Sequence, residues 1–451
     1  MELENINRVY LIGIGGIGMS GLARYFKKRG CVVCGYDKTP TPLTDSLMNE
    51  GIPVVFYDNE DNIPLSFQEE DPYTLIIYTP AIPKDSKILN HFASHSFALK
   101  KRSEVLGIIS KSMFTIAVAG THGKTTTSSI IAYILKDSGY DCSAFLGGIA
   151  TNYNSNVLFG DNNTLVVEAD EYDRSFLTLH PDISIITSMD ADHLDIYGDQ
   201  QHLIESFQLF ASQLKPGGKL IYRKGLALNN GVTYAANEVA EIQAVNVHIK
   251  NGLFFFDFKN ATETIEDLQL GLPGLHNIEN AVAAIEVALL LEIPAEKIKQ
   301  ALANFAGIKR RFEYIVKNDD HIYIDDYAHH PEELRACIQA VKSLYPDKKL
   351  TTIFQPHLFS RTRDFADSFA KVLALTDELI MLDIYPAREL PIEGVTSQMI
   401  LNKINSPNKR LCGKQEAIEY VRTEKPELLL TVGAGDIDTL IKPLKNALQN
   451  V

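Results

Sequence analysis

The chain has 451 residues, of which 45% are hydrophobic and 22% charged, and its formal net charge at pH 7 is −14. This length predicts about three domains, and the composition is ordinary for a globular protein that buries several cores. The negative charge argues against a nucleic-acid partner and against binding to anionic membranes. It does not exclude anionic small molecules, because helix N-termini bind phosphates even in acidic proteins.

The sequence contains no recognisable export or membrane segment. Its first residues, Met-Glu-Leu-Glu-Asn, lack the basic start of a secretory signal, and no apolar run reaches the roughly 18 residues that span a bilayer. We therefore expect a cytoplasmic protein with no membrane partner. Cys31 and Cys34 form the one C-x-x-C among five cysteines. Both lie in a strand-like run, where side chains three apart point to opposite faces, so we expect core thiols.

Strands alternate with helices along the whole chain. In residues 1–107, apolar runs predict strands at 8–14, 31–36 and 74–78 and a helix at 19–29. Such alternation implies a parallel sheet with right-handed crossovers, and hence an α/β fold.

The middle part, residues 108–307, continues this pattern and then departs from it. We expect strands at 114–119, 164–167 and 183–187, and helices that follow the first strand and residue 274. The stretch 219–270 contains shorter alternating runs, which predict an antiparallel excursion. The last part, residues 308–451, is again α/β, with strands expected at 322–325, 350–354, 379–382 and 428–432.

A glycine-rich loop follows the strand at 114–119. It consists of Gly120, Thr121, His122, Gly123, Lys124, Thr125 and Thr126. A strand, such a loop and a helix together bind nucleotide phosphates: backbone N–H groups point at the anion, the lysine reaches the β- and γ-phosphates, and the threonine offers its hydroxyl to Mg²⁺. The first glycine is two residues nearer the lysine than in the usual pattern. The loop nevertheless predicts ATP and Mg²⁺ as ligands.

Two further side chains fit a metal–nucleotide site. Glu168 lies at the end of a predicted strand, and His193 follows the next one. In a parallel sheet the carboxyl ends of the strands meet at one edge, where ligands bind. We therefore predict that Thr125, Glu168 and His193 serve Mg²⁺. For the neighbouring acids, among them Glu171, a role as helix caps is at least as good an explanation.

A second glycine motif occupies the start of the chain. Gly13, Gly15, Gly16 and Gly18 form a G-x-G-x-x-G run between a strand and a helix, and Asp37 ends the next strand. This is the dinucleotide fingerprint, so an NAD-dependent dehydrogenase is a rival interpretation. The same geometry binds any nucleoside diphosphate, including a UDP-sugar. A ligase that uses ATP on a nucleotide-linked substrate explains both loops with one active site.

With these motifs the chain resembles the Mur ligases of peptidoglycan synthesis, and within them the branch that adds L-alanine to UDP-N-acetylmuramate. The resemblance covers nearly the full length and rests on ordered motifs. They are GIGGIGMSG (13–21), GTHGKTTT (120–127), EADE (168–171), DHLD (192–195), GLHN (274–277), KRRF (309–312), DDYAHHP (325–331), FQPH (354–357), SRTR (360–363) and GAGD (433–436).

The resemblance implies three domains: a Rossmann-like domain for the UDP-substrate at 1–107, a P-loop ATPase-like domain at 108–307 and a Rossmann-like amino-acid domain at 308–451. It implies that ATP phosphorylates the substrate carboxylate and that L-alanine displaces the phosphate, giving UDP-MurNAc-L-alanine, ADP and phosphate. The protein would be a monomer or weak homodimer. The family assigns His276, Asn277, Arg311 and Asp326 to ATP and Tyr327 to the UDP-substrate; Lys124, His193, His329, His357 and Arg361 would be catalytic.

Two residues, Phe207 and Leu358, help to indicate to which branch of the Mur ligases the chain is similar. Later-acting ligases carry a modified lysine where this chain has Phe207, as the alanine-adding branch does. Many alanine-adding members have an arginine where this chain has Leu358, so Arg361 or Arg363 must hold the alanine carboxylate. His193, His329 and His357 all remain candidates for the group that takes the amine proton.

Three alternatives stay open beside this assignment. One is the recycling ligase that attaches a whole tripeptide to UDP-MurNAc, which shares the phosphate loop and the E-A-D-E-Y-D run at 168–173. The others are the dehydrogenase and an inactive nucleotide-binding module. A zinc site at His329 and His330 is disfavoured, because no cysteine or third histidine lies at suitable spacing.

Overall fold

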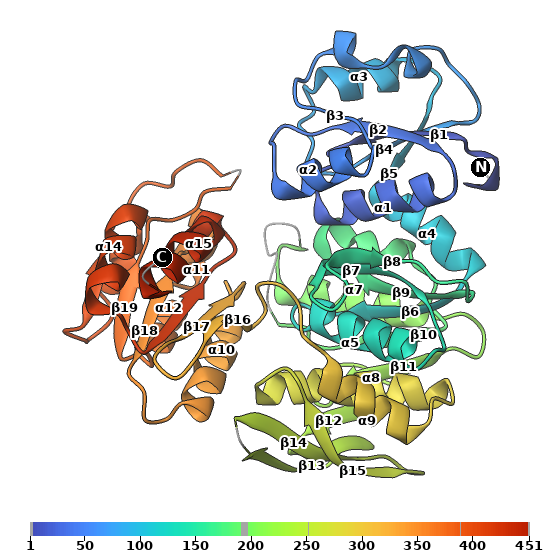
Figure 1. The fold of residues 1–451 in the computed structure, drawn as a ribbon. Coiled ribbons are helices and arrows are strands. Elements are labelled where there is room, and N and C mark those ends of the chain that lie inside the picture. The colour runs from blue at the N-terminus through green and yellow to red at the C-terminus, as the bar shows by residue number, and fades with distance from the viewer. Residues whose placement is uncertain (1–2, 191–196, 251, 388, 450–451) are drawn as a thin grey trace. The chain divides into compact units, whose positions relative to one another are not determined.

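The computed structural model describes residues 3–190, 197–250, 252–387 and 389–449. The chain forms two compact units. The first comprises Met1–Val245, Phe258–Ile265 and Asn280–Asn304, and the second comprises Asn246–Asp257, Glu266–Glu279 and Phe305–Val451. The described residues form three β-sheets with flanking helices, so the α/β prediction with three sheet-centred parts is confirmed (Figure 1).

The first sheet is parallel, with strand order β3-β2-β1-β4-β5. Helix α1, which was expected at 19–29, starts two residues earlier, with Gly16 as its N-cap, and ends at Lys28. The elements are β1 (Arg8–Ile12), α1 (Ile17–Lys28), β2 (Val32–Tyr36), α2 (Pro42–Asn49), β3 (Val54–Val55), β4 (Thr74–Tyr78), α3 (Lys87–Ser94), β5 (Ala98–Lys101) and α4 (Arg102–Ser112).

The two cysteines of the C-x-x-C lie on opposite faces of this sheet, as expected. Cys31 belongs to one hydrophobic cluster with Val9 and Leu11, and Cys34 belongs to the other with Tyr10. Both thiols are free and buried. The two cysteines therefore belong to separate hydrophobic cores and do not form a common site.

The second sheet has the order β15-β14-β13-β12-β11-β10-β6-β9-β7-β8. Its elements are β6 (Phe114–Ala119), α5 (Lys124–Asp137), β7 (Ser143–Ala150), β8 (Ser155–Leu158), β9 (Thr164–Ala169), β10 (Ile183–Ile186), α7 (Gln200–Ser212), β11 (Lys219–Arg223), β12 (Val232–Ala236), β13 (Ile242–Lys250), β14 (Leu253–Lys259), β15 (Thr264–Leu270), α8 (Leu275–Leu290) and α9 (Ala295–Asn304).

The antiparallel excursion predicted for 219–270 is shorter than expected. β11, β12 and the start of β13 continue the parallel sheet from β10. β13, β14 and β15 are neighbours in the sheet joined by connections of a few residues, as in antiparallel hairpins. The prediction missed the antiparallel pair of β7 and β8 at the other edge, where Ala144 pairs with Leu158.

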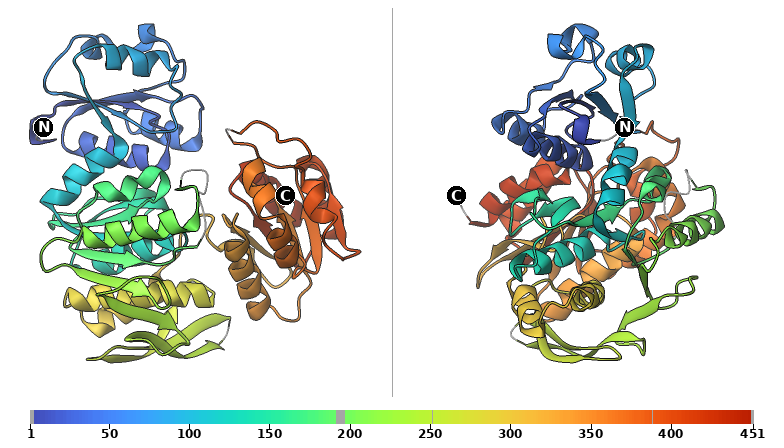
Figure 2. Two further views of the ribbon diagram at one scale, coloured as in Figure 1. Left: turned by 180° about the vertical axis from the view of Figure 1, so that it is seen from behind. Right: turned by 90° about the vertical axis from the view of Figure 1, so that its right-hand side faces the viewer.

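The third sheet, in the second unit, has the order β16-β17-β21-β18-β19-β20 and is parallel except for β16. Adjacent residues of β18 show that helices cover both faces (Figure 2). Ile353 packs in the cluster of α14 and α15, while Phe354 contacts Phe369 of α12. The elements are β16 (Glu313–Lys317), β17 (Ile322–Asp326), α10 (Pro331–Leu344), β18 (Leu350–Phe354), α11 (Phe359–Asp364), α12 (Ala366–Leu373), β19 (Glu378–Met381), α13 (Ser397–Leu401), β20 (Lys409–Leu411), α14 (Lys414–Glu424), β21 (Leu428–Val432) and α15 (Ile441–Gln449).

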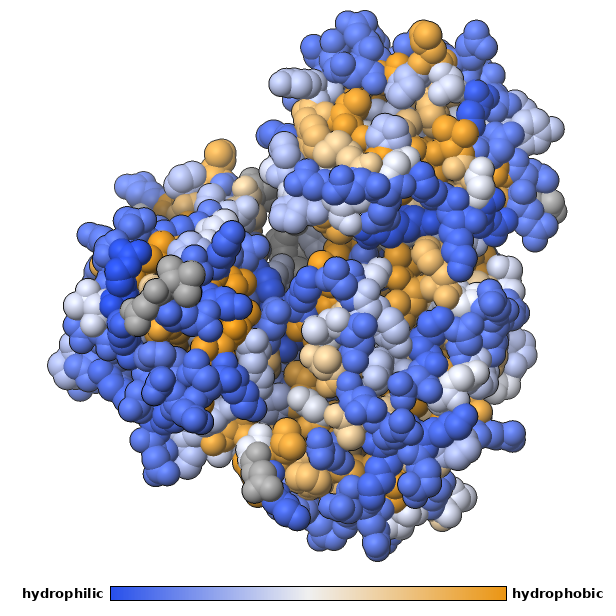
Figure 3. All heavy atoms as spheres, viewed as in Figure 1, coloured by the Kyte–Doolittle hydropathy of each residue, from blue (hydrophilic) through white to orange (hydrophobic). Residues whose placement is uncertain are grey.

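In the described part of the chain, no helix is both long enough and hydrophobic enough to cross a lipid bilayer. Hydrophilic residues cover most of the face in Figure 3, and hydrophobic ones are confined to smaller areas between them.

Candidate functional site

The loop at 120–123 connects β6 to α5, and its two glycines are sterically required. Gly120 has φ +138° and Gly123 has φ +81°. A Cβ atom at Gly120 would lie 2.1 Å from Oγ1 of Thr187, which no side chain tolerates. Both backbone conformations favour glycine, which explains why the sequence pattern fixes these positions.

Residues after the adjacent strand β10 hold this loop in place. The hydroxyl of Thr187 donates to the carbonyls of Ala119 and His122. Ser188 Oγ accepts the N–H of His122 at 2.7 Å. On the other side, Asn280 of α8 accepts the hydroxyl of Thr127 at 3.2 Å. Sequence reasoning named none of these three supports, because each is brought to the loop by the fold.

Lys124 is the first residue of α5 and forms a buried ion pair with Glu171. Its Nζ donates to the carbonyl of Gly120 at 2.6 Å and to the Glu171 carboxylate oxygens at 2.7 and 3.0 Å. Burial lowers the pKa of Lys124, but the carboxylates of Glu171, Asp170 and Glu168 together more than offset this, and the net pKa is raised. Glu171 occupies the N-cap position of the turn at Tyr172–Thr178, but its side chain makes no capping hydrogen bond there and binds Lys124 instead.

Glu168 lies at the end of β9, next to the strand that carries the loop. It pairs in register with Val118 of β6, and its carboxylate accepts the N–H of Gly147 at 2.9 Å. A Cβ at Gly147 would lie 2.3–2.5 Å from that carboxyl group, so this glycine makes room for it. Thr125 follows Lys124 in the first turn of α5. His193 lies outside the described residues, among which no group of three His, Cys, Asp or Glu side chains is arranged to bind a metal.

The first glycine loop lies between β1 and α1, with Asp37 beside it. Gly13 has φ +88°, and the N–H of Gly15 donates to Asp37 at 2.8 Å. Through this hydrogen bond Asp37 stabilises the conformation of the glycine loop. Arg102, at the start of α4, lies against Gly18, where a Cβ would meet its guanidinium at 2.6 Å, and it reaches Asp170 at 3.5 Å. Arg102 was not among the predicted site residues.

In the second unit, His276, Arg311 and Asp326 lie near one another. Burial, assisted by the positive charge of Arg311, lowers the pKa of His276 to about 4, although Glu333 opposes this. Asp326 ends β17 and accepts the N–H groups of Phe312 and Ala328, both at 2.7 Å. Burial raises the pKa of Asp326 to about 6 despite these bonds and the nearby Arg311. Asn277 instead faces the backbone: its amide donates to the carbonyl of Pro273 at 2.6 Å.

The loops after β17 and β18 bring the remaining predicted side chains together. The rings of Tyr327 and His329 lie 5.3 Å apart, and those of His329 and His357 lie 5.8 Å apart. Nδ1 of His329 lies 3.0 Å from the carbonyl of Tyr327. Burial lowers the pKa of His329 to about 3; Glu333 opposes this shift and Arg361 adds to it. Leu358 has φ +70°, a strained conformation for leucine that aims the chain into α11.

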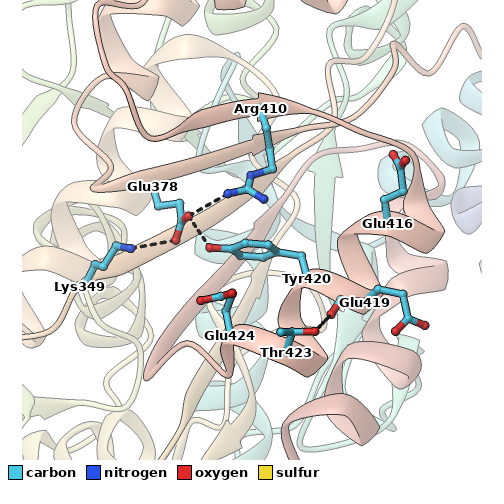
Figure 4. A pocket seen from close by; sticks show the side chains of 8 residues that line it. All are labelled: Lys349, Glu378, Arg410, Glu416, Glu419, Tyr420, Thr423 and Glu424. Carbon is cyan, nitrogen blue, oxygen red and sulfur yellow. Dashed lines mark hydrogen bonds and ion pairs between the residues drawn. The ribbon is translucent and has the colours of Figure 1, made fainter.

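A pocket of about 570 Å³ in the second unit contains none of the predicted residues (Figure 4). Glu378 is its centre: Lys349 donates to it at 3.1 Å, Tyr420 donates through its hydroxyl, and Arg410 lies at 3.6 Å. Glu378 is the first residue of β19 and so lies at the amino end of the sheet. Ligands of parallel sheets bind at the carboxyl ends, so this cluster is structural.

Comparison with known proteins gives consistent results along the chain. Residues 8–113 match the family model for the Mur ligase family catalytic domain, residues 118–288 match the Mur ligase middle domain, and residues 310–435 match the Mur ligase glutamate ligase domain. The UDP-N-acetylmuramate–L-alanine ligase of Flavobacterium psychrophilum is 52% identical over 448 residues, which is 99% of both chains. That of Cytophaga hutchinsonii is 49% identical over 455 residues, covering 99% of this chain and 97% of its own.

Solved structures agree with this. A UDP-N-acetylmuramate–alanine ligase from Thermotoga maritima has a TM-score of 0.84 at 27% identity, covering 98% of this chain and 99% of its own. A murein peptide ligase from Psychrobacter arcticus shares the fold, with a TM-score of 0.70 at 24% identity and the same coverage. With full-length relatives near 50% identity and matching domains in the same order, the chain belongs to the Mur ligase family.

Proposed function

We propose that this enzyme joins L-alanine to UDP-N-acetylmuramate, with conversion of ATP to ADP and phosphate, in peptidoglycan synthesis. The observation that carries the proposal is the full-length identity of about 50% to ligases of that name, together with a glycine loop that presents Lys124 at the start of α5. We further propose the domain bounds 1–107, 108–307 and 308–451 and a cytoplasmic monomer or weak homodimer.

The first chemical step activates a carboxylate. An oxygen of the muramoyl carboxylate attacks the γ-phosphorus, the bond to ADP breaks, and an acyl phosphate forms. Because two anions must approach to about 3–3.5 Å, positive charge is needed between them. Lys124 supplies it, and its position in the first turn of a helix adds the N-terminal dipole.

Mg²⁺ fits the oxygen donors beside this lysine. Thr125 lies in the first turn of α5, directly after β6, and Glu168 lies at the end of the adjacent parallel strand β9. Both offer oxygen donors, which are the ligands that Mg²⁺ prefers. We assign both residues to the ion and add His193 from the sequence alone. The ion, when bound, offsets the negative charge of the phosphates.

The second step forms the amide. The alanine amine attacks the acyl carbon, phosphate leaves, and the amine loses a proton. A proton acceptor works best when its pKa is near the operating pH, and that of His329 is about 3. We therefore assign His329 to positioning, with Nδ1–H donated to the Tyr327 carbonyl, and favour His357 over it as the acceptor.

The other residues of the second unit complete the assignment. We assign Arg311, Asp326, His276 and Asn277 to the nucleotide and Tyr327 to the UDP-substrate. Leu358 stands where many relatives of this branch have an arginine, so the alanine carboxylate falls to Arg361, which is nearly buried at the start of α11. In the first unit, we assign the loop Gly13–Gly18 to the diphosphate of UDP.

The test is phosphate release by purified protein supplied with ATP, Mg²⁺ and UDP-N-acetylmuramate, with a panel of L-alanine, glycine, L-serine and the tripeptide. We expect release that requires both UDP-N-acetylmuramate and L-alanine. Release with the tripeptide and not with L-alanine would assign the recycling reaction. NADH oxidation without ADP formation would assign a dehydrogenase.

A further inference from the structure

Every N–H donor of the Lys124 ammonium group has an acceptor within the protein. The group has three donors. The carbonyl of Gly120 and the two carboxylate oxygens of Glu171 lie 2.6, 3.0 and 2.7 Å from Nζ. A phosphate oxygen that binds Lys124 must therefore replace at least one of them. The loop carbonyl is fixed by the strand before it, so the partner that yields is Glu171.

The backbone holds Glu171 in this position. Its carbonyl accepts the Tyr197 hydroxyl at 2.6 Å and the N–H of Arg174 at 2.9 Å. Asp173 and Arg174 both adopt φ of +53°, a left-handed conformation that is unfavourable for two successive non-glycine residues. Strain of this kind persists where the surroundings impose it, and it is concentrated at functional sites. The strained turn thus fixes the carboxylate in front of the lysine.

Stability alone does not explain the pair. The side chain of Glu171 is 1% exposed and that of Lys124 is 14% exposed. A buried ion pair must overcome the loss of hydration of both charges, and well-packed apolar residues often stabilise a fold as much or more. A buried pair at the phosphate loop, whose lysine is the group that meets the phosphates, therefore fits a role in handling the phosphates.

We propose that Glu171 is an internal competitor for the nucleotide phosphates: it binds Lys124 whenever phosphate does not, and so promotes release of the product. The proposal rests on the assignment of this loop to ATP. Phosphate binding separates Lys124 from Glu171 and leaves a negative carboxylate near a negative ligand. When the γ-phosphate has been transferred, Glu171 reclaims the lysine, and ADP loses that contact.

Removal of this carboxylate charge should tighten binding of the product. In Glu171→Gln the side chain keeps its shape, while the competitor for Lys124 loses its charge. We expect the Kd for ADP to fall at least about tenfold, the effect of one hydrogen bond to a charged group. The change should appear mainly as slower dissociation of ADP.

The experiment is titration calorimetry of ADP, with and without Mg²⁺ and without other substrates, plus stopped-flow ADP dissociation. Glu171→Asp retains the charge and should give a Kd nearer the wild-type value than Glu171→Gln does. Glu238→Gln is the matched control: it makes the same substitution at an exposed ion pair of the first unit, with Lys224 at 3.9 Å, and should leave the Kd unchanged.

The outcomes separate this inference from the proposed function. If the wild-type protein binds no ADP, the assignment of the loop itself fails. If it binds ADP and Glu171→Gln binds no more tightly, only the competitor role fails. Weaker binding by Glu171→Gln that appears only with Mg²⁺ would make Glu171 a metal ligand and overturn the proposal. Melting curves of each variant show that the comparison is between folded proteins.

Discussion

The Lys124–Glu171 pair allows a stability prediction whose size follows from its burial. In Lys124→Met the lysine charge is lost while Glu171, 1% exposed, stays in place. A buried charge without its partner destabilises a protein by about 3–5 kcal/mol. The carboxyl group can instead become protonated. An unfolded glutamate titrates near pH 4.3, so protonation at pH 7 costs about 1.4 kcal/mol for each of about 2.7 pH units, or about 4 kcal/mol.

The smaller of these two penalties sets the expected loss at each pH. At pH 7 it is about 3–4 kcal/mol. At pH 5, protonation costs only about 1 kcal/mol, so the loss should shrink to that value. Loss of the lysine leaves a desolvated carboxylate, which favours the protonated form. The destabilisation is therefore present above the unfolded pKa and disappears as the pH falls towards it.

Denaturant unfolding at pH 7 and pH 5 measures this loss, and hydrogen exchange of the α5 amides localises it to the first unit. The double variant Lys124→Met/Glu171→Gln removes both charges and should recover most of the stability at pH 7. A Lys124→Met protein as stable as the wild type at pH 7, or one with the same loss at both pH values, would refute the reasoning.

Three further predictions use other residues. Lys124→Ala should lower ligase turnover at least about 10²-fold, the loss of one electrostatic contact in a transition state, and near-normal phosphate release would contradict this. Gly147→Ala places a Cβ 2.3–2.5 Å from the Glu168 carboxyl and should raise the Mg²⁺ concentration for half-maximal activity; an unchanged Mg²⁺ dependence would argue against the metal role of Glu168. Because His329 stays neutral in the fold, with a pKa near 3, its contribution to stability is lost as pH falls below 6.5. Wild type should therefore lose about 2 kcal/mol more than His329→Asn between pH 7 and pH 5, and equal losses in unfolding would refute the assignment.

The buried parallel strands were the best predicted part of the fold. β6, β9 and β10 read as continuous apolar runs that end at glycine, carboxylate or hydroxyl residues, which is the pattern of strands covered on both faces. The β7–β8 pair was missed because its residues 147–149 are small or partly exposed and interrupt the alternation. β11 and β12 were taken as antiparallel because the stretch 219–270 contains short alternating runs, although both strands are parallel.

The sequence predicted the residues of the glycine loop, since glycines with positive φ and a lysine at a helix start are local features. The supports of that loop could not be predicted in the same way. Asn280 lies 153 residues from its partner Thr127, and Ser188 lies 66 residues from His122. No local pattern distinguishes such a side chain from any other polar residue in a helix or after a strand, so only the folded chain identifies it.

Glu168 and Glu171, only three residues apart, also show that local sequence patterns do not identify every residue of the site. Both belong to one acidic run, and the strand pattern singled out only the first, because it ends β9 in register with β6. Straight continuation of the strand would place residue 171 on the face opposite residue 168. The chain instead leaves β9 at Ala169 and turns through left-handed Asp173 and Arg174, so that Glu171 faces Lys124. A single run of acids therefore provides two carboxylates whose charges act on Lys124. Strand register places the first and a strained turn places the second, and only the first placement obeys a periodicity that can be read from sequence.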